Sequence, residues 1–471
     1  MVTNYSLVVP DYDPANLKTG VVHIGYGAFH RAHQSLYFDR LAQEQGDMGY
    51  GIAVVNLRVA DADAFATATA NLPYVLRSVA SDGTTEDRLI QIHTQAKDWT
   101  RDAQGAEALV ALASVQILTI TVSEAGYYLN GAGDLDVDHP VIQSEMIGEG
   151  KSSIFAYLAN GLEARRLAGA GPITVACCDN IRGNGHMLQR AFGQYLQHKG
   201  DDALLTWTAA NVTFPNSMVD RITPKPPAID VSALEQKLDT ALGQTIMAED
   251  FVQWVLEDNF AGERPPLASV GVTVTTNVEP YEETKIRVLN GGHTALTYMG
   301  ALAGFETFDQ AFVSDELNEH FGKFEQQEVL SALPENLPFD AGDYLATIAT
   351  RFRNQHIGDT VQRICSDGFA KFPIFIRPTL EGCFQQGQIP IHAIRSIASW
   401  VVFSRRVFSD RLEFDYFEPN RERLLPLVQA DDLEEFVNNE PLWGDLAAQF
   451  PQFQQELERQ VALVEQQWPA Q

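Results

Sequence analysis

The first half of the chain alternates short apolar runs with amphipathic segments. Four apolar runs of strand length are predicted to form buried strands: Val21–Ile24, Gly51–Val55, Val115–Val122 and Ile173–Cys178. Segments with helical spacing lie between them, including Asp61–Ala70 and Ser153–Ala168, and Gly169 follows the second. This alternation indicates a parallel sheet with crossover helices.

The first half also contains an insertion, and the second half shows a different pattern. Within the first half, a β-rich insertion with a turn at Ser81-Asp82-Gly83 is expected over Tyr74–Ile92. After about Thr284, long helical patterns dominate, over Lys285–Gly304 and Ile391–Phe408. We therefore predict an α/β protein with a Rossmann-type, dinucleotide-binding N-terminal domain over 1–280 and a mainly α-helical substrate and catalytic domain over 281–471.

Composition and charge narrow the class of protein. The chain has 471 residues, of which 45% are hydrophobic, and this suits a globular protein of two or three domains. The 33 basic and 62 acidic residues give a net charge of −29, which argues against a nucleic acid or an anionic membrane as partner. No apolar run approaches the length of about 18 residues needed to span a membrane.

The N-terminal residues and the cysteines suggest a cytoplasmic location. The N-terminus, Met1–Tyr5, has no basic region before an apolar stretch, so no signal peptide is expected. The four cysteines have neither metal-binding nor redox spacing; they are Cys177, Cys178, Cys365 and Cys383. No HExxH motif or paired His/Cys spacing is present, so we expect no metal.

A glycine turn follows the first predicted strand. Gly25-Tyr26-Gly27 leads into a helical pattern, and a strand, a turn and a helix start can place a pyrophosphate against free backbone N–H groups. Gly25 would permit the tight turn and Gly27 would let the backbone approach the phosphates. His30 stands where the usual fingerprint has its third glycine. A simple turn remains the alternative interpretation.

Polar residues also follow two later strands. In doubly wound folds ligands bind at the carboxyl ends of strands. Glu124 could therefore touch a nicotinamide ribose, and Asn180 could donate a hydrogen bond to a substrate oxygen. A helix-capping carboxylate and an Asx-turn are the respective alternatives.

Three polar residues mark the start of the second half. On an α-helix of 3.6 residues per turn, Asn290 would lie roughly 140° and His293 roughly 80° around from Lys285. An amine, an amide and an imidazole together suit proton removal from an alcohol whose oxygen is held in place. Further on, Arg363 and Lys371 could hydrogen-bond hydroxyls or a carboxylate. An ordinary amphipathic helix and a solvated surface are the alternatives.

Five motifs occur in order along the chain: Gly25–His33, Thr121–Tyr127, Cys178–Asn180, Phe214–Pro224 and Lys285–His293. Together they resemble the polyol-specific long-chain dehydrogenases, the group of mannitol 2-dehydrogenase and fructuronate reductase. The resemblance extends from Gly20 to about Pro378. Within the group the chain is more similar to the mannitol dehydrogenases, for example over Phe251–Asp258.

The resemblance implies roles for individual residues. Lys285 would be the general base, Asn180 and Asn290 would polarise the substrate oxygen, and His293 would orient it. Glu282 would belong to a proton path to solvent. The implied substrate contacts are Arg363 and Lys371, and the implied cofactor contacts are Gly25, Gly27, Phe29, His30, Arg31, Asp61 and Glu124.

The sequence also departs from the family pattern in places. Gly292 stands where a serine is usual, Phe369-Ala370 where small polar residues are common, and Tyr128 where a cysteine is usual. The first two lie near the expected substrate pocket, so the identity of the polyol stays open.

The implied activity is NAD-dependent, metal-independent hydride transfer between a sugar alcohol and a ketose. An acidic residue after the second strand commonly binds the adenosine ribose and repels a 2′-phosphate, so Asp61 favours NAD over NADP, although Arg58 could reach a 2′-phosphate. A hexuronate reductase and a catalytically silent NAD-binding regulatory protein are the alternatives. The expected partner is a small polyol or ketose, and the oligomeric state is left open.

Overall fold

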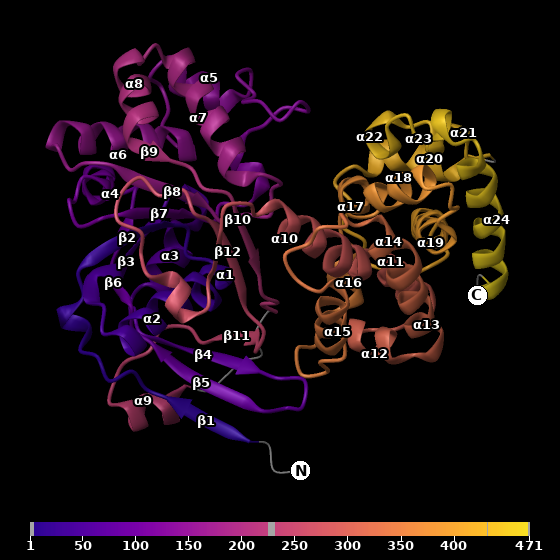
Figure 1. Ribbon diagram of the computed structural model, residues 1–471, viewed down its shortest axis with the longest axis horizontal. Coiled ribbons are helices and arrows are strands. Elements are labelled where there is room, and N and C mark those ends of the chain that lie inside the picture. Colours follow the sequence, from indigo (N-terminus) through magenta and orange to yellow (C-terminus); the bar gives the residue numbers. More distant parts are fainter. Residues whose placement is uncertain (1–3, 225–230, 431, 470–471) are drawn as a thin grey trace. The chain divides into compact units, whose positions relative to one another are not determined.

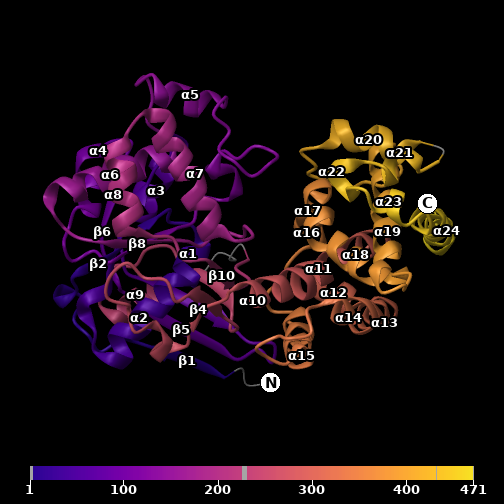
Figure 2. The same cartoon turned by 45° about the horizontal axis from the view of Figure 1, so that its top comes forward.

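The computed structural model describes residues 4–224, 231–430 and 432–469. Met1–Thr3, considered above for a signal peptide, lie outside the described residues. The chain forms two compact units, Met1–Glu279 and Pro280–Gln471, which are shown in Figures 1 and 2. We call them unit 1 and unit 2 and describe each by itself.

A six-stranded parallel sheet is the centre of unit 1. Its strand order is β6-β3-β2-β7-β8-β9, and every neighbouring pair is parallel. The strands are β2 (Thr19–Ile24), β3 (Gly51–Asn56), β6 (His93–Asp98), β7 (Ile117–Ile120), β8 (Ile173–Cys177) and β9 (Val212–Thr213). Numbered in chain order this is 3-2-1-4-5-6, the order of the Rossmann fold, so the predicted fold class and the four predicted strands are confirmed.

Both faces of this sheet are buried, which explains the unbroken apolar runs in the sequence. Val22 and Ala53 face α4 (Ala103–Val110), α6 (Ile154–Ala168) and α7 (Asn184–Lys199) in one core cluster. Their chain neighbours Val21 and Ile52 pack with α2 (Gln34–Gln45) in another. Successive side chains thus enter opposite cores, as the twofold period of a strand requires.

Two smaller sheets complete unit 1. The first has the order β1-β5-β4-β11 and contains β1 (Tyr5–Val8), β4 (Tyr74–Val79), β5 (Thr85–Ile90) and β11 (Ile246–Glu249). The antiparallel pair β4–β5 turns at Gly83, which has φ 86°, so the predicted hairpin is confirmed. The second sheet contains β10 (Ser217–Asp220), β12 (Gln253–Glu257) and β13 (Thr273–Thr275).

Shorter helices connect these strands. The α-helices are α1 (Ala28–Ala32), α3 (Ala62–Ala68), α5 (Pro140–Met146), α8 (Asp202–Asn211) and α9 (Ser232–Leu238). The 3₁₀ turns are η1 (Pro14–Asn16), η2 (Met48–Tyr50), η3 (Val59–Asp61), η4 (Glu124–Tyr127) and η5 (Leu267–Val270).

Unit 2 is mainly helical in its described part, as predicted. The helix α19 (Ile391–Phe408) lies at its centre, and α11 (Gly291–Leu302) and α24 (Gln452–Gln467) pack along it (Figures 1 and 2). Trp400 and Trp443 are fully buried in the shared core. No helix among the described residues is long and apolar enough to cross a membrane.

The remaining helices of unit 2 surround this core. Two of them are π-helices, η6 (Lys285–Asn290) and η7 (Phe324–Val329). The α-helices are α10 (Glu279–Thr284), α12 (Phe308–Val313), α13 (Asp315–Lys323), α14 (Leu330–Ala332), α15 (Ala341–Phe352), α16 (Val361–Cys365), α17 (Gly368–Phe375), α18 (Arg377–Gln385), α20 (Arg421–Gln429), α21 (Glu434–Val437), α22 (Glu440–Trp443) and α23 (Leu446–Gln449).

Candidate active site

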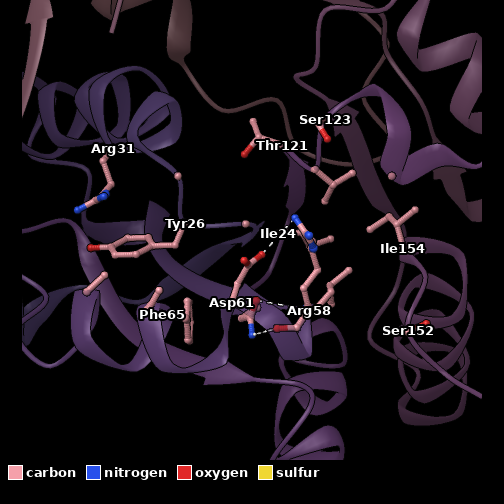
Figure 3. A pocket seen from close by; sticks show the side chains of 18 of the residues that line it. Ile24, Tyr26, Arg31, Arg58, Asp61, Phe65, Thr121, Ser123, Ser152 and Ile154 are labelled. Carbon is pink, nitrogen blue, oxygen red and sulfur yellow. Dashed lines mark hydrogen bonds and ion pairs between the residues drawn. The ribbon is translucent and has the colours of Figure 1, made fainter. Parts of the chain in front are cut away.

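A cavity of about 480 Å³ lies in unit 1 where β2 and β7 end (Figure 3). Strand order reverses between these two strands, and this is where doubly wound sheets bind ligands. Its walls come from the loops after β2, β3 and β7, and include Gly25, Gly27, Asn56, Thr121 and Ser123.

The glycine turn has the geometry that its sequence predicts. Gly25 has φ +103°, and a Cβ on it would lie 2.5 Å from the carbonyl oxygen of Thr121, so only glycine fits there. A Cβ on Gly27 would meet nothing within 4 Å. Gly27 therefore leaves open space at the cavity wall, where a ligand can approach the backbone.

Charged side chains lie at two places around this cavity, as Figure 3 shows. The Arg31 guanidinium lies 4.9 Å from the centre of the Tyr26 ring and donates to Gln244 at 3.4 Å. Arg58 forms an ion pair with Asp61, with Nη1 and Oδ2 3.4 Å apart. The predicted residues Arg31 and Asp61 thus both line the cavity, together with Tyr26 and Gln244, which sequence reasoning did not single out.

Three other predicted cofactor contacts are placed differently among the described residues. His30 is fully buried, stacks on His23 at 3.5 Å and approaches His93, with their Nε2 atoms 3.1 Å apart. Phe29 stacks on the ring of His33. Glu124 is exposed, and its neighbours Ser123 and Gly126, not Glu124 itself, line the cavity. In this structure His30 supports the sheet beneath the glycine turn.

Asn180 lies exposed in the bend after β8. Its neighbour Asp179 accepts hydrogen bonds from the backbone N–H groups of Val122 and Ser123 and from the hydroxyl of Tyr127. Asp179 therefore ties the loop after β8 to the loop after β7, which lines the cavity. Sequence reasoning missed this role, although the polar residues directly after a buried strand signalled it.

In unit 2, the segment that carries Lys285 and Asn290 is a π-helix and not the expected α-helix. The backbone N–H of Gly291 donates to the carbonyl of Ile286, an i→i+5 hydrogen bond. Residues five apart therefore lie more nearly above one another than the α-helical angle of roughly 140° allows. The expectation of α-helical geometry was wrong here, and the π-helix places the amine and the amide on one face.

Lys285 itself is buried, with 6% of its surface exposed. Arg287 links the π-helix to two neighbouring groups: it donates to Glu283 at 2.5 Å and to the carbonyl oxygen of Ala332 at 2.6 Å. Glu282 is half-buried on α10, just before this segment.

His293 lies on the first turn of α11 between two aromatic rings. Its ring centre is 4.6 Å from that of Phe308 and 4.3 Å from that of Phe352. Burial lowers the pKa of His293 well below its ordinary value, and so do four nearby cations, Arg363, Arg351, Lys371 and Lys285. At neutral pH the imidazole is therefore uncharged, and it has both a donor and an acceptor nitrogen.

Those charge effects place three of the predicted residues, Lys285, Arg363 and Lys371, near His293. Arg363 on α16 is held by Asp359, which its Nε contacts at 2.5 Å in a two-pronged pair. Lys371 on α17 donates to the carbonyl oxygen of Ile364 at 2.9 Å, and burial lowers its pKa. Because Asp359 offsets the charge of Arg363, the cluster is less cationic than its basic residues alone suggest.

Among the described residues, no group of three or more His, Cys, Asp or Glu side chains is arranged to hold a metal ion. The side chains around His293 are instead cations and aromatic rings.

Comparison with known proteins covers both units. Residues 19–269 match the mannitol dehydrogenase Rossmann domain, and residues 277–464 match the mannitol dehydrogenase C-terminal domain. A D-arabinitol 4-dehydrogenase of Klebsiella pneumoniae is 35% identical over 430 residues, 90% of this chain and 94% of the relative. A mannitol 2-dehydrogenase of Cereibacter sphaeroides is 35% identical over 452 residues, 94% of this chain and 93% of the relative.

Solved structures agree. Mannitol 2-dehydrogenase of Pseudomonas fluorescens, in a ternary complex with NAD and D-mannitol, has a TM-score of 0.85 and 31% identity, and covers 98% of this chain and 94% of its own. A D-sorbitol dehydrogenase in substrate-free form has a TM-score of 0.84 and 28% identity, and the match covers 97% of this chain and 94% of that protein. With both domains matched over most of their length, the chain belongs to the mannitol dehydrogenase family of polyol dehydrogenases.

Proposed function

We propose that the protein is an NAD-dependent dehydrogenase that oxidises a secondary alcohol of a linear polyol to a ketose, with Lys285 as general base and without a metal. One observation carries the proposal. A buried lysine begins a π-helix, an asparagine stands five residues on, and an uncharged histidine follows. π-Helical segments occur frequently at functional sites, and this one carries Lys285 and Asn290 and leads directly into the turn of α11 that carries His293.

The cavity of unit 1 fits a dinucleotide. Gly25 makes a turn that only glycine allows, Gly27 leaves its wall open, and Asp61 offers a carboxylate to ribose hydroxyls. The named relative with 31% identity was solved with NAD. The chemistry supplied by a bound nicotinamide is acceptance of a hydride from the alcohol carbon.

The residues of this chain would handle the proton and the oxygen. As the C–H bond loses its hydride, the O–H proton passes to Nζ of Lys285, and a carbonyl group forms. The step requires that this amine be uncharged before it takes the proton. The amide of Asn290 and the neutral imidazole of His293 would hydrogen-bond the oxygen as negative charge develops on it. We assign the same role to Asn180 because it belongs to the Cys178–Asn180 motif.

Arg363 and Lys371 would contact the other hydroxyls of the substrate, and Glu282 would lead the proton to solvent. The pairing of Arg363 with Asp359 suits a neutral polyol better than a carboxylate, because the added charge of a uronate would meet an already neutralised cation. Gly25, Gly27, Arg31 and Asp61 would hold the cofactor directly. Phe29, His30 and Glu124 would support it from behind or beside the cavity wall.

The names of the relatives suggest which alcohol reacts. Position 4 of the five-carbon arabinitol and position 2 of the six-carbon mannitol are both the carbon next to a chain end. We infer that this protein also oxidises the carbon next to a terminal hydroxymethyl group. Chain length would then depend on residues beyond the Lys285 cluster.

The test is NADH formation with D-arabinitol, D-mannitol and D-sorbitol, and NADH consumption with the matching ketoses and with fructuronate. We expect turnover of at least one polyol with its ketose, and little with fructuronate. Turnover of fructuronate alone would support a hexuronate reductase. No turnover with any of them, together with intact NADH binding, would support a silent cofactor-binding protein and contradict the proposal.

A further inference from the structure

Glu325 is a buried acid that the proposed reaction does not use. It is the second residue of the π-helix η7 and has no exposed surface. Among the described residues, neither of its carboxyl oxygens has a hydrogen-bond partner. A charge without a partner is strongly disfavoured in such a place, and burial raises the pKa of Glu325 well above its ordinary value. Burial therefore favours the protonated, uncharged form of this carboxyl group.

This acid lies directly against the proposed catalytic segment. A Cβ placed on Gly292 would lie 3.0 Å from Oε1 of Glu325, 2.8 Å from Phe321 and 3.2 Å from Phe352. Phe352 in turn packs on the ring of His293 at 4.3 Å. The absence of a side chain at position 292 is what lets Glu325 approach the backbone of α11 between Asn290 and His293.

Gly291, the residue before Gly292, also lies near η7. A Cβ on Gly291 would lie 4.0 Å from Cζ of Phe324, and η7 packs against η6 as well as against α13, α14, α18 and α19. Burial is the cause that raises the pKa of Glu325. The ionisable groups on the neighbouring elements do not add to this shift or oppose it; they include Lys285, Arg287, His320, Lys323, Cys383 and His392. Nothing on these elements therefore compensates a negative charge on Glu325.

We propose that Glu325 is a positioning residue of the active site proposed above: as a neutral acid packed on Gly292 it holds the turn from Asn290 to His293, and its ionisation displaces that turn. The inference rests on the proposed function for the meaning of that turn. An ionised carboxylate at this place would have to gain water or a cation, and η7 would have to move away from α11 to admit either. His293 would move with the Phe352 ring and the Gly292 backbone.

Glu328 provides a matched control on the same π-helix. Burial raises its pKa to about 7, but its oxygens accept hydrogen bonds from the backbone N–H groups of His392 and Ala393, each at 2.8 Å. Glu328 thus caps the start of α19, and its side chain is not among the three that lie nearest to a Cβ placed on Gly292. A Glu328→Gln variant changes an equally buried acid without touching the proposed turn.

The experiment measures kcat and kcat/KM for polyol oxidation by the full chain between about pH 7 and pH 10, a range in which a buried carboxyl with a raised pKa ionises. We expect a reversible alkaline loss of kcat of about tenfold or more in the wild type and in Glu328→Gln, and its absence in Glu325→Gln, which cannot ionise. The same alkaline loss in Glu325→Gln, or no loss in the wild type, overturns the proposal. Glu325→Met replaces Glu325→Gln if the amide variant does not fold.

A second measurement does not depend on activity. The infrared carboxylic-acid C=O band of the wild type at neutral pH should lose intensity in Glu325→Gln and disappear at the alkaline transition. No difference in this band would overturn the protonated state of Glu325. If the band behaves as expected but no polyol is oxidised, the proposed function fails and the positioning role fails with it, while the buried acid stands.

Discussion

Arg58 and Asp61 form an ion pair at the rim of the unit 1 cavity, with Nη1 and Oδ2 3.4 Å apart. Both side chains are more than half exposed, so the pair is weak and a ligand can separate it. In the proposed function Asp61 would then face the ribose with a carboxylate, and Arg58 would be able to meet a phosphate.

We expect kcat/KM to be at least about tenfold higher with NAD than with NADP, a difference of about 1.4 kcal/mol. Asp61→Ala should narrow this gap because it removes the carboxylate that repels a 2′-phosphate and leaves Arg58 in place. Asp63→Ala is the matched control, since Asp63 pairs with Arg101 and does not line the cavity. Equal or better use of NADP by the wild type would show that Arg58 sets the preference.

The second prediction concerns the base. Lys285→Ala should lower kcat for polyol oxidation by about 10²- to 10⁴-fold, the usual contribution of a general base, while NADH binding measured by fluorescence stays intact. Lys199→Ala, at the exposed end of α7, should leave kcat unchanged. If Lys285→Ala kept a tenth of the wild-type kcat, another group would be the base.

The fold was predictable because its signals are local. The strands Val21–Ile24 and Ile173–Cys178 are continuous apolar runs, and burial on both faces of a parallel sheet produces such runs. The turn at Gly25 was predictable because its φ of +103° requires glycine.

Other parts of the site were not predictable because they depend on tertiary contacts. The spacing of Lys285 and Asn290 does not distinguish an α-helix from a π-helix, since one changed hydrogen-bond register alters their relative angle. His30 reads as a ligand contact in its motif, and only the packing of His23 and His93 around it shows that it is buried. Glu325 was not singled out from the sequence, because the space beside Gly292 that admits it is created by tertiary packing.

The third prediction concerns metal. Exhaustive treatment with EDTA should leave polyol oxidation unchanged, because Lys285 would supply the base and the described residues hold no cluster of metal-binding side chains. The measurement is kcat before and after treatment, with zinc or magnesium added back. Activity that is lost and then restored specifically by zinc would contradict the lysine mechanism.

The last prediction concerns how the histidines beneath the glycine turn make the stability of the fold depend on pH. His23, His30 and His93 are buried together, and burial lowers the pKa of all three, that of His93 to about 3. The nearby cation Arg31 lowers the pKa of His30 and His93 further. When the pKa of a histidine is lower in the folded protein than in the unfolded chain, a falling pH protonates that histidine in the unfolded chain first. Stability is therefore complete above the ordinary histidine pKa of about 6.5 and is lost as the pH falls below it.

Each such histidine should contribute a loss of up to about 1.4 kcal/mol per pH unit. Thermal unfolding of the full chain between about pH 8 and pH 4.5 should show a steep fall in Tm below about pH 6.5. His93→Gln should make that fall shallower, because the amide does not titrate and can still hydrogen-bond His30. His198→Gln, at an exposed position near the end of α7, should leave the slope unchanged. An identical slope in His93→Gln and the wild type would mean that the acid sensitivity of the fold arises elsewhere.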